Sequence, residues 1–485
     1  MATNGYECGL KLIKELTTNT EQIQDEVLRE ILSQNAGTEY LRVFLHGQTE
    51  KQLSKKNVPV VTYEDLKPYI DRIANRETSE ILLAKPVTGS ETSGGQPKLI
   101  LVTAKYQKKG ALYGIKIPYL VLLLTINYGL LLRLNKKIEL YTSPIETIFC
   151  PDPNHGLYCQ LLFSLIQRDE VVKVGSLFAS VVLRGIKFLE NHWQELCYDI
   201  KTGRLSDWIT DSGCRDAASL VMKPNPEQAD LIENICNCKS WEGIVRKLWP
   251  KARYIYCVCT GIMRQYIAEL EFYCRGLPLV STSYACSEAI CGINLEPLCK
   301  PCDVSYTFLP NIDTELVDLV NVKVVPTLMV FLSRLYQYKV GDVLMVSGFY
   351  NNAPQFQFVE RKNVILSVDQ EKTSETDLFK AITEAKALLD PLGFILTEYT
   401  SYVDTSSAPG KNCKELDPKI MWNIIAALEI RVVKQGSFEV LMDYYVSKGT
   451  SLSQYKKPSC IKSEEALKIL DSRVIGKYFS HKSPL

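Results

Sequence analysis

The spacing of apolar residues predicts several helices in the first two hundred residues. Over residues 8–56, apolar positions recur every three or four residues, which is typical of amphipathic helices. Residues 58–70 are typical of a short strand followed by a helix that Thr62 caps ahead of two acidic residues. The helical pattern returns over residues 160–196, and we expect a helix there.

The second half of the chain alternates between strand and helix patterns. Runs of β-branched and aromatic residues between turns predict strands within residues 251–297, 341–350 and 355–368. A helix capped by Ser374 is expected to end at Gly393. Residues 428–449 predict a strand, a turn and a helix, and a helix ending near Leu470 is expected to finish the chain.

This mixture of elements defines the expected fold class and domains. Strands and helices alternate throughout, which indicates a mixed α/β or α+β fold. We expect a large domain over residues 1–358, a hinge over residues 359–368, and a smaller domain over residues 369–485. A chain of 485 residues is long enough for such a division.

Composition narrows the function classes. The formal net charge is +1, so the chain lacks the excess positive charge that would indicate nucleic acid or an anionic membrane surface as a partner. The polar N-terminus resembles no secretory leader, so we interpret the 16 cysteines as reduced thiols of a cytoplasmic protein. Metal binding by the C-x-x-C of Cys299 and Cys302 is the alternative, and it is less favoured because a second such pair is missing.

An apolar run at residues 117–134 is the one feature that fits a membrane span. Its eighteen residues lie near the lower length limit for a transmembrane helix, and Asn127 and Arg133 interrupt it. We favour a buried helix or strand pair over a membrane segment, although periodicity cannot separate the two at this length.

The segment "TGSETSGGQPK", residues 88–98, has the composition of a phosphate-binding loop. Glycines allow backbone N–H groups to approach an anion, and hydroxyl groups add donors. It is not a Walker loop, because Gly95 stands where lysine would follow. Glu91 places an anion in its middle, so a surface turn of similar composition is an equally good interpretation of the residues alone.

Three further motifs follow in order. Glu288 comes after small polar residues and a predicted strand, which suits a Mg²⁺ ligand, although an exposed loop carboxylate has the same pattern. Asp342 follows a glycine turn and could accept ribose hydroxyls, whereas Phe356 on the next strand fits a core position better than base stacking. Lys456 lies in a Gly/Ser loop, where a lysine can offset charge on a phosphate or is simply solvated.

The order of these motifs is that of an adenylate-forming ligase, and the chain resembles a specific family. Segments such as "KKNVPVVTYEDLKPYIDRI", "GINLEPLCKPCDVSYTFLPN" and "VGDVLMVSGFYNNAPQFQFV" are similar to the plant auxin-responsive acyl-acid amido synthetases. The resemblance covers about three-quarters of the chain and is closest to the benzoate- and isochorismate-glutamate ligase branch. It implies an adenylate-forming architecture with a large N-terminal domain and a small, mobile C-terminal domain.

The resemblance also implies an activity. ATP and Mg²⁺ would activate a small benzoate-, isochorismate-, salicylate-like or hormone acid as an acyl-adenylate. The amine of an amino acid, expected to be glutamate, would then form an amide in plant hormone or defence metabolism. We expect a cytoplasmic monomer with small-molecule substrates and without nucleic-acid or membrane partners.

The same resemblance assigns roles to individual residues. Catalytic roles fall on Lys456 and Glu288, and Glu288 is also the expected Mg²⁺ ligand. Nucleotide-binding roles fall on residues of all four motifs and of the segment just past the hinge: Ser90, Thr92, Ser93, Tyr284, Cys286, Ser287, Asp342, Phe356 and Lys372.

The chain also departs from the family pattern. Gly89 and Glu91 replace a serine and a glycine of the family loop, and Ala285 and Cys286 replace a Gly-Ser pair. The resemblance stops over residues 99–140, an apolar segment that stands in place of the helix expected to meet the acyl carboxylate. The chain is also shortened after Asn311 and in the small domain. An impaired relative with only a binding role, or a truncated gene model, is therefore the alternative to an active ligase.

Overall fold

The computed structural model describes most of the chain. The described residues are 11–75, 77, 80–82, 141–286, 290–310, 314–316, 324–331, 339–361, 366–368, 371–373, 399–402, 429–450, 455, 457–458, 460–461 and 463–479. The chain divides into two compact units, Met1–Val359 and Glu360–Leu485. The division falls at the start of the segment proposed as a hinge.

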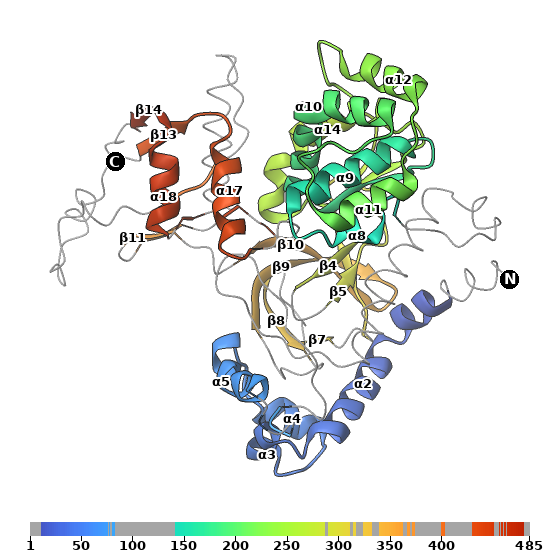
Figure 1. The fold of residues 1–485 in the computed structure, drawn as a ribbon. Coiled ribbons are helices and arrows are strands. Elements are labelled where there is room, and N and C mark those ends of the chain that lie inside the picture. The colour runs from blue at the N-terminus through green and yellow to red at the C-terminus, as the bar shows by residue number, and fades with distance from the viewer. Residues whose placement is uncertain are drawn as a thin grey trace. The chain divides into compact units, whose positions relative to one another are not determined.

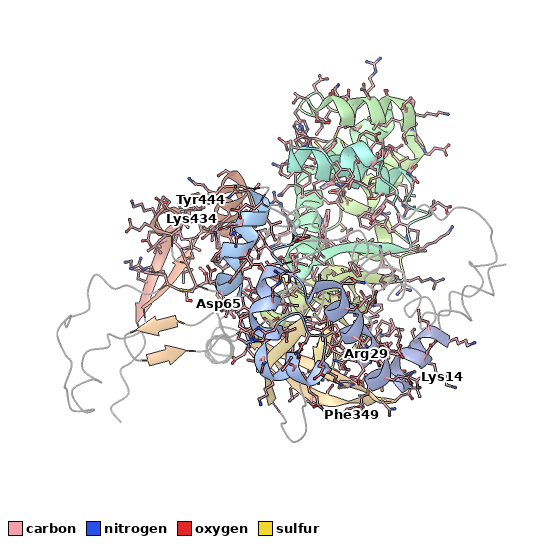
Figure 2. All side chains as sticks on the ribbon, turned by 90° about the horizontal axis from the view of Figure 1, so that it is seen from below. Lys14, Arg29, Asp65, Phe349, Lys434 and Tyr444 are labelled. Carbon is pink, nitrogen blue, oxygen red and sulfur yellow. The ribbon has the colours of Figure 1, made fainter. Side chains whose placement is uncertain are left out.

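Short helices form the N-terminal part of the first unit, as the apolar spacing predicts. They are α2 (Thr20–Asn35), α3 (Glu39–Leu45), α4 (Lys51–Asn57) and α5 (Tyr63–Ala74). The start of α5 has the expected cap, because the Asp65 carboxylate accepts the backbone N–H of Thr62 at 2.7 Å and its hydroxyl at 2.8 Å. Figure 2 marks Asp65 at this end of the helix.

A three-stranded parallel sheet with surrounding helices follows. Its strands are β1 (Lys173–Phe178), β2 (Tyr254–Val258) and β3 (Leu279–Val280), in that order. The helices of this layer are α8 (Ile145–Ile148), α9 (Pro153–Ile166), α10 (Ala179–Thr202), α11 (Ser212–Val221), α12 (Pro226–Cys236), α13 (Ile244–Leu248), η3 (Gly261–Tyr266) and α14 (Ile267–Cys274). All of them except α8 contribute residues to one large hydrophobic core, and this layer is drawn in green in Figure 1.

The expectation of a helix over residues 160–196 is wrong in its middle. Strand β1 separates α9 from α10 and pairs with β2, with Gly175 opposite Tyr256. A Cβ atom on Gly175 would lie 2.2 Å from the backbone oxygen of Tyr256, so this pairing needs a glycine. Strand β1 lies at the edge of this sheet and is mostly half-buried. Its six residues, Lys-Val-Gly-Ser-Leu-Phe, are too few and too mixed for spacing alone to separate them from the helices on either side.

A second sheet of seven strands completes the first unit. Its order is β4-β5-β6-β10-β9-β8-β7, and every strand pairing with a resolved register is antiparallel. The strands are β4 (Ser283–Ala285), β5 (Ile290–Ile293), β6 (Tyr306–Phe308), β7 (Thr314–Leu316), β8 (Val324–Phe331), β9 (Lys339–Tyr350) and β10 (Ala353–Arg361). The strands β8 and β9 curve strongly (Figure 1), and residues of α2, α3 and α5 share a hydrophobic core with this sheet.

The second unit contains two small antiparallel pairs and two helices. The pairs are β11 (Leu366–Val368) with β12 (Glu371–Thr373), and β13 (Glu429–Val433) with β14 (Val474–Phe479). Helices α17 (Ser437–Ser447) and α18 (Glu464–Asp471) pack together through Leu441, Ala466 and Leu470.

Two expectations are refined by the structure, and a third is not tested. The strand expected over residues 355–368 is divided into β10 and β11. The helix α18 does not finish the chain, because β14 follows it and pairs with β13. The helix expected after Ser374 lies outside the described residues.

The apolar run at residues 117–134 also lies outside the described residues. Within the part of the chain that the structure describes, no helix is both long and apolar enough to cross a membrane.

Candidate functional site

Aromatic side chains line the junction of the curved sheet with the N-terminal helices. The ring of Tyr284 stacks on Phe308 with centroids 5.9 Å apart and lies 5.8 Å from the ring of Tyr306. Phe308 in turn contacts Phe356, with centroids 4.7 Å apart. All four are buried members of the core that α2, α3 and α5 share with the sheet. The apolar face of this sheet therefore positions Tyr284 rigidly.

Tyr284 joins two of the motifs singled out in the sequence. Its hydroxyl donates a hydrogen bond of 2.5 Å to Oδ2 of Asp342, and both residues are buried. Burial, and then the charge of Asp342, raises the pKa of Tyr284 well above its ordinary value, so this phenol stays protonated as a donor.

The strand order shows how unusual this contact is. Three strands, β5, β6 and β10, lie between β4 and β9. In a flat sheet, four strand spacings would separate the two backbones by about 19 Å, too far for these side chains to meet. The sheet must therefore curl on itself, as the curvature in Figure 1 shows, and the curl brings the two predicted nucleotide-binding residues together.

A second polar network, which the sequence reasoning missed, lies beside this pair. Ser281 and Tyr306 are joined through their hydroxyl groups at 2.9 Å, and Asn294 donates to the backbone oxygen of Ser281 at 2.9 Å. All three residues are buried. The only signal in the sequence is that Ser281 and Asn294 each directly follow a short apolar run, and that pattern is too common to identify a site.

Of the other predicted residues, the structure describes Cys286, Phe356 and Lys372. Cys286 is half-buried and packs against the same core, and Phe356 is only 2% exposed, as expected of a core position. The backbone of Lys372 lies in β12, opposite Ser367. The remaining candidates lie outside the described residues: Ser90, Thr92, Ser93, Ser287, Glu288 and Lys456. Glu91 lies outside them too.

The neighbour of the predicted catalytic lysine is described, and it is anchored. Lys457 is 3% exposed, and its ammonium lies 4.6 Å from the ring centroid of Phe438 and 5.6 Å from that of Tyr399. Both distances fit cation–π contacts in a desolvated setting. Lys457 therefore fixes one position of the Gly/Ser loop that carries Lys456.

The cysteines of the described residues are free thiols, and most of them are buried. Cys257 and Cys259, one of the C-x-C pairs, have their sulfur atoms 3.3 Å apart inside the parallel-sheet core. Of the C-x-x-C pair, Cys302 is exposed and Cys299 is half-buried.

Comparison with protein families identifies three matching domains along the chain. The GH3 family N-terminal domain matches residues 9–135 and 131–279, the GH3 family central domain matches residues 303–361, and the GH3 family C-terminal domain matches residues 418–465. The first of these covers more than half of the chain.

Curated relatives match over nearly the whole length. The chain is 45% identical to the indole-3-acetic acid-amido synthetase GH3.17 of Arabidopsis thaliana, over 99% of this chain and 97% of the relative. It is 42% identical to the 4-substituted benzoates-glutamate ligase GH3.12 of the same plant, over 97% and 98%. The first alignment spans 593 positions, more than the 485 residues here, so that relative has internal segments that this chain lacks.

Solved structures agree with this match. The GH3.15 acyl acid amido synthetase has a TM-score of 0.88 and 43% identity, with 98% of both chains covered. The AtGH3.15 acyl acid amido synthetase in complex with 2,4-DB has a TM-score of 0.86 and 42% identity, covering 100% of this chain and 99% of the other.

Proposed function

Because the chain belongs to the GH3 family, we propose that it is an amide-forming ligase that uses ATP to join a small carboxylic acid to an amino acid. The observation that carries the proposal is the match over essentially the full chain to amido synthetases, in both sequence and fold. The hydrogen bond between Tyr284 and Asp342 supports it, because two motifs far apart in the sequence meet at one place.

The proposed reaction has two steps. The acid attacks ATP to give an acyl-adenylate and pyrophosphate, and the amine of the amino acid then displaces AMP. AMP is a far better leaving group than hydroxide, which is the reason for the activation.

This chain's residues have proposed parts in the first step. Lys456 would offset charge on the phosphate, and Tyr284, Asp342 and the hydroxyls of residues 90–93 would hold the nucleotide. Glu288 offers the oxygen ligand that Mg²⁺ prefers, and Mg²⁺ would neutralise phosphate charge.

We propose an aromatic acid of the benzoate, isochorismate, salicylate or auxin type, with glutamate as the amino acid. The names of the relatives support this range, since one acts on indole-3-acetic acid and another joins 4-substituted benzoates to glutamate. We place the reaction in plant hormone or defence metabolism, carried out by a cytoplasmic monomer.

The second candidate is an impaired relative that only binds ligands. The internal segments missing against GH3.17 favour it, and so does Glu91 in the phosphate loop.

Pyrophosphate release separates the two candidates. The full chain is incubated with ATP, Mg²⁺ and a panel of acids, including salicylate, benzoate and indole-3-acetic acid, and ATP binding is measured in parallel. Release that depends on the acid, followed by amide formation with glutamate, supports the ligase. ATP binding without release supports the impaired relative, and loss of both rejects the ligase.

Two lysine variants test the site within the same assay. Lys456→Ala should lower the rate of pyrophosphate release by about a hundredfold, because a preorganised charge at the phosphate is lost. Lys434→Ala is the matched control, since Lys434 is an exposed lysine of the same unit (Figure 2). Equal rates in the two variants would remove Lys456 from the mechanism.

A further inference from the structure

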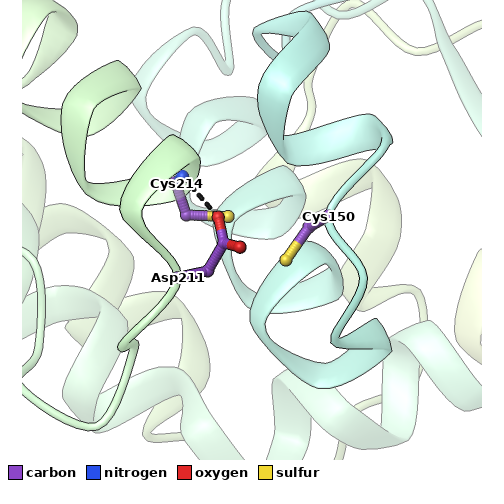
Figure 3. A group of neighbouring side chains, drawn as sticks. All are labelled: Cys150, Asp211 and Cys214. Atoms are coloured by element: carbon purple, nitrogen blue, oxygen red, sulfur yellow. Dashed lines mark hydrogen bonds between the residues drawn. The ribbon is translucent and has the colours of Figure 1, made fainter.

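Three potential metal ligands from two separate segments converge at the start of α11. Cys150 follows α8, Asp211 is the N-cap residue of α11, and Cys214 lies in the first turn of that helix. One ligand atom from each residue lies within 4.8 Å of those of the other two. Figure 3 shows the Asp211 carboxylate between the two sulfur atoms.

The carboxylate is held in place by the helix itself. Oδ1 of Asp211 accepts the backbone N–H of Cys214 at 2.8 Å, which fixes the orientation of the group. The bond also keeps the carboxylate at the N-terminus of α11, where the helix dipole favours an anion. A metal ion would therefore meet an oriented anion.

The backbone is shaped to bring the two segments together. A Cβ atom on Gly156 of α9 would lie 3.0 Å from the backbone oxygen of Thr147 and 3.4 Å from Cβ of Cys150. Glycine at this position lets the turn that carries Cys150 pack closely on α9. The cluster thus lies where α8, α9 and α11 contact one another.

Zinc takes four ligands in structural sites, and the cluster offers three of them. Histidine nitrogens are possible zinc ligands, but among the described residues none belongs to this cluster. A water molecule would fill the fourth position on a bound ion.

The chemistry of these donors selects among metals. Thiolate sulfur favours zinc and other soft divalent ions, whereas Mg²⁺ and Ca²⁺ prefer oxygen ligands only. A bound ion would displace the protons of both thiols into solvent and leave three negative charges around it. The positive end of the α11 dipole offsets part of their repulsion. Cys150 and Asp211 are half-buried and Cys214 is buried, so an ion can enter from solvent and then be enclosed.

We propose that Cys150, Asp211 and Cys214 form a binding site for a zinc ion, which fastens the segment after α8 to the start of α11. The site is separate from the residues assigned to the ligase reaction, and its test does not depend on catalysis.

The test titrates Zn²⁺ alone into the reduced, metal-free full chain, in competition with a chromophoric chelator. One ion is expected to bind, and Co²⁺ in its place should give the sulfur-to-metal charge-transfer absorption of thiolate coordination. Thermal unfolding should shift upward with Zn²⁺, because binding to the folded state alone stabilises it.

Two variants locate the ion. Asp211→Asn keeps a good helix N-cap but removes the charge, so the chain should fold and bind Zn²⁺ about a hundredfold more weakly. Cys150→Ser should weaken binding at least as much and remove part of the Co²⁺ absorption. Cys302→Ser, in the exposed C-x-x-C, is the control and should leave both unchanged.

The outcomes are decisive. Absence of a tight equivalent of Zn²⁺ in the unaltered chain would overturn the proposal. Equal binding in Asp211→Asn, Cys150→Ser and the unaltered chain would do so too, and so would loss of binding in Cys302→Ser, which would assign the ion to the other cysteine pair.

Discussion

Tyr284 on β4 donates a hydrogen bond to Asp342 on β9 across the interior of a curled sheet. Removing the donor with Tyr284→Phe leaves a buried carboxyl group short of one partner. Hydrogen bonds to charged groups contribute about 1.5–3 kcal/mol, so we expect a loss of that size in the free energy of unfolding. Urea denaturation of the full chain, followed by far-UV circular dichroism, measures it.

The matched control is Tyr306→Phe in the same sheet. Tyr306 is equally buried, but its hydroxyl pairs with the neutral hydroxyl of Ser281, a bond for which about 1 kcal/mol is expected. A loss in Tyr284→Phe no larger than that in Tyr306→Phe would show that Asp342 gains little from the bond.

Asp199 is the centre of a buried network in the parallel-sheet layer. It accepts the hydroxyl of Tyr158 at 2.7 Å and both the backbone N–H and the hydroxyl of Ser206, at 2.9 Å and 2.8 Å. Asp199→Ala removes the acceptor of all three donors, of which only the two hydroxyl groups, 3.3 Å apart, can still pair with each other. We expect it to destabilise the fold by about 3 kcal/mol. A loss below the cost of one ordinary hydrogen bond would mean that water takes the place of the carboxylate.

The carboxyl group of Asp199 should make the free energy of unfolding fall as pH rises. Burial, the largest cause, raises the pKa of Asp199 above its ordinary value despite the hydrogen bonds. The folded state therefore holds this proton more tightly than the unfolded state. The stabilisation that the bound proton gives at low pH is lost as pH rises through the raised pKa.

The free energy of unfolding of the unaltered chain, relative to Asp199→Asn, should thus fall as pH rises from the ordinary aspartate pKa upward. Denaturation series at several acidic pH values measure the difference. A difference that stays flat, or that grows with pH, would contradict the raised pKa.

The sequence predicted features that depend on local patterns, but it did not predict contacts between distant strands. The cap of α5 and the order strand, turn, helix in β13 and α17 follow from local chemistry, and the structure confirms them. The meeting of Tyr284 with Asp342 requires the curl of a whole sheet, which no local pattern encodes, and only the family resemblance grouped the two. Strand β1 was missed because its six residues, which include Lys173, Gly175 and Ser176, show no apolar alternation that separates them from the neighbouring helices.

Gly175 in that missed strand gives a sharp test of the sheet. In Gly175→Ala, the new Cβ would overlap the backbone of Tyr256, so strand β1 must shift, and we expect a loss of about 1–3 kcal/mol. In Gly185→Ala, within α10, the new Cβ meets nothing within 4 Å, and alanine should stabilise the helix by about 0.5–1 kcal/mol. Thermal unfolding should show a lower melting temperature for Gly175→Ala and a higher one for Gly185→Ala. Equal shifts would refute the pairing of β1 with β2.

Glu91 gives the prediction that bears most directly on activity. A carboxylate about 5 Å from one phosphate charge costs roughly 3 kcal/mol at an effective dielectric near 20. A side chain where the family loop has glycine costs on the order of 1–2 kcal/mol more if that position has a positive φ. If the loop holds ATP as proposed, the two costs together would lower ATP affinity by about three powers of ten, so Glu91→Gly should lower the Kd for ATP by up to that factor.

Glu91→Gln separates the two causes, because it removes the charge and keeps the side chain. If the charge dominates, Gln should recover most of the gain that Gly gives, and if backbone strain dominates, only Gly should. Calorimetric titration with ATP and Mg²⁺ measures both variants beside the unaltered chain. No gain in either would place the defect in the internal segments that this chain lacks against GH3.17, since restoring the loop would then have left the site incomplete.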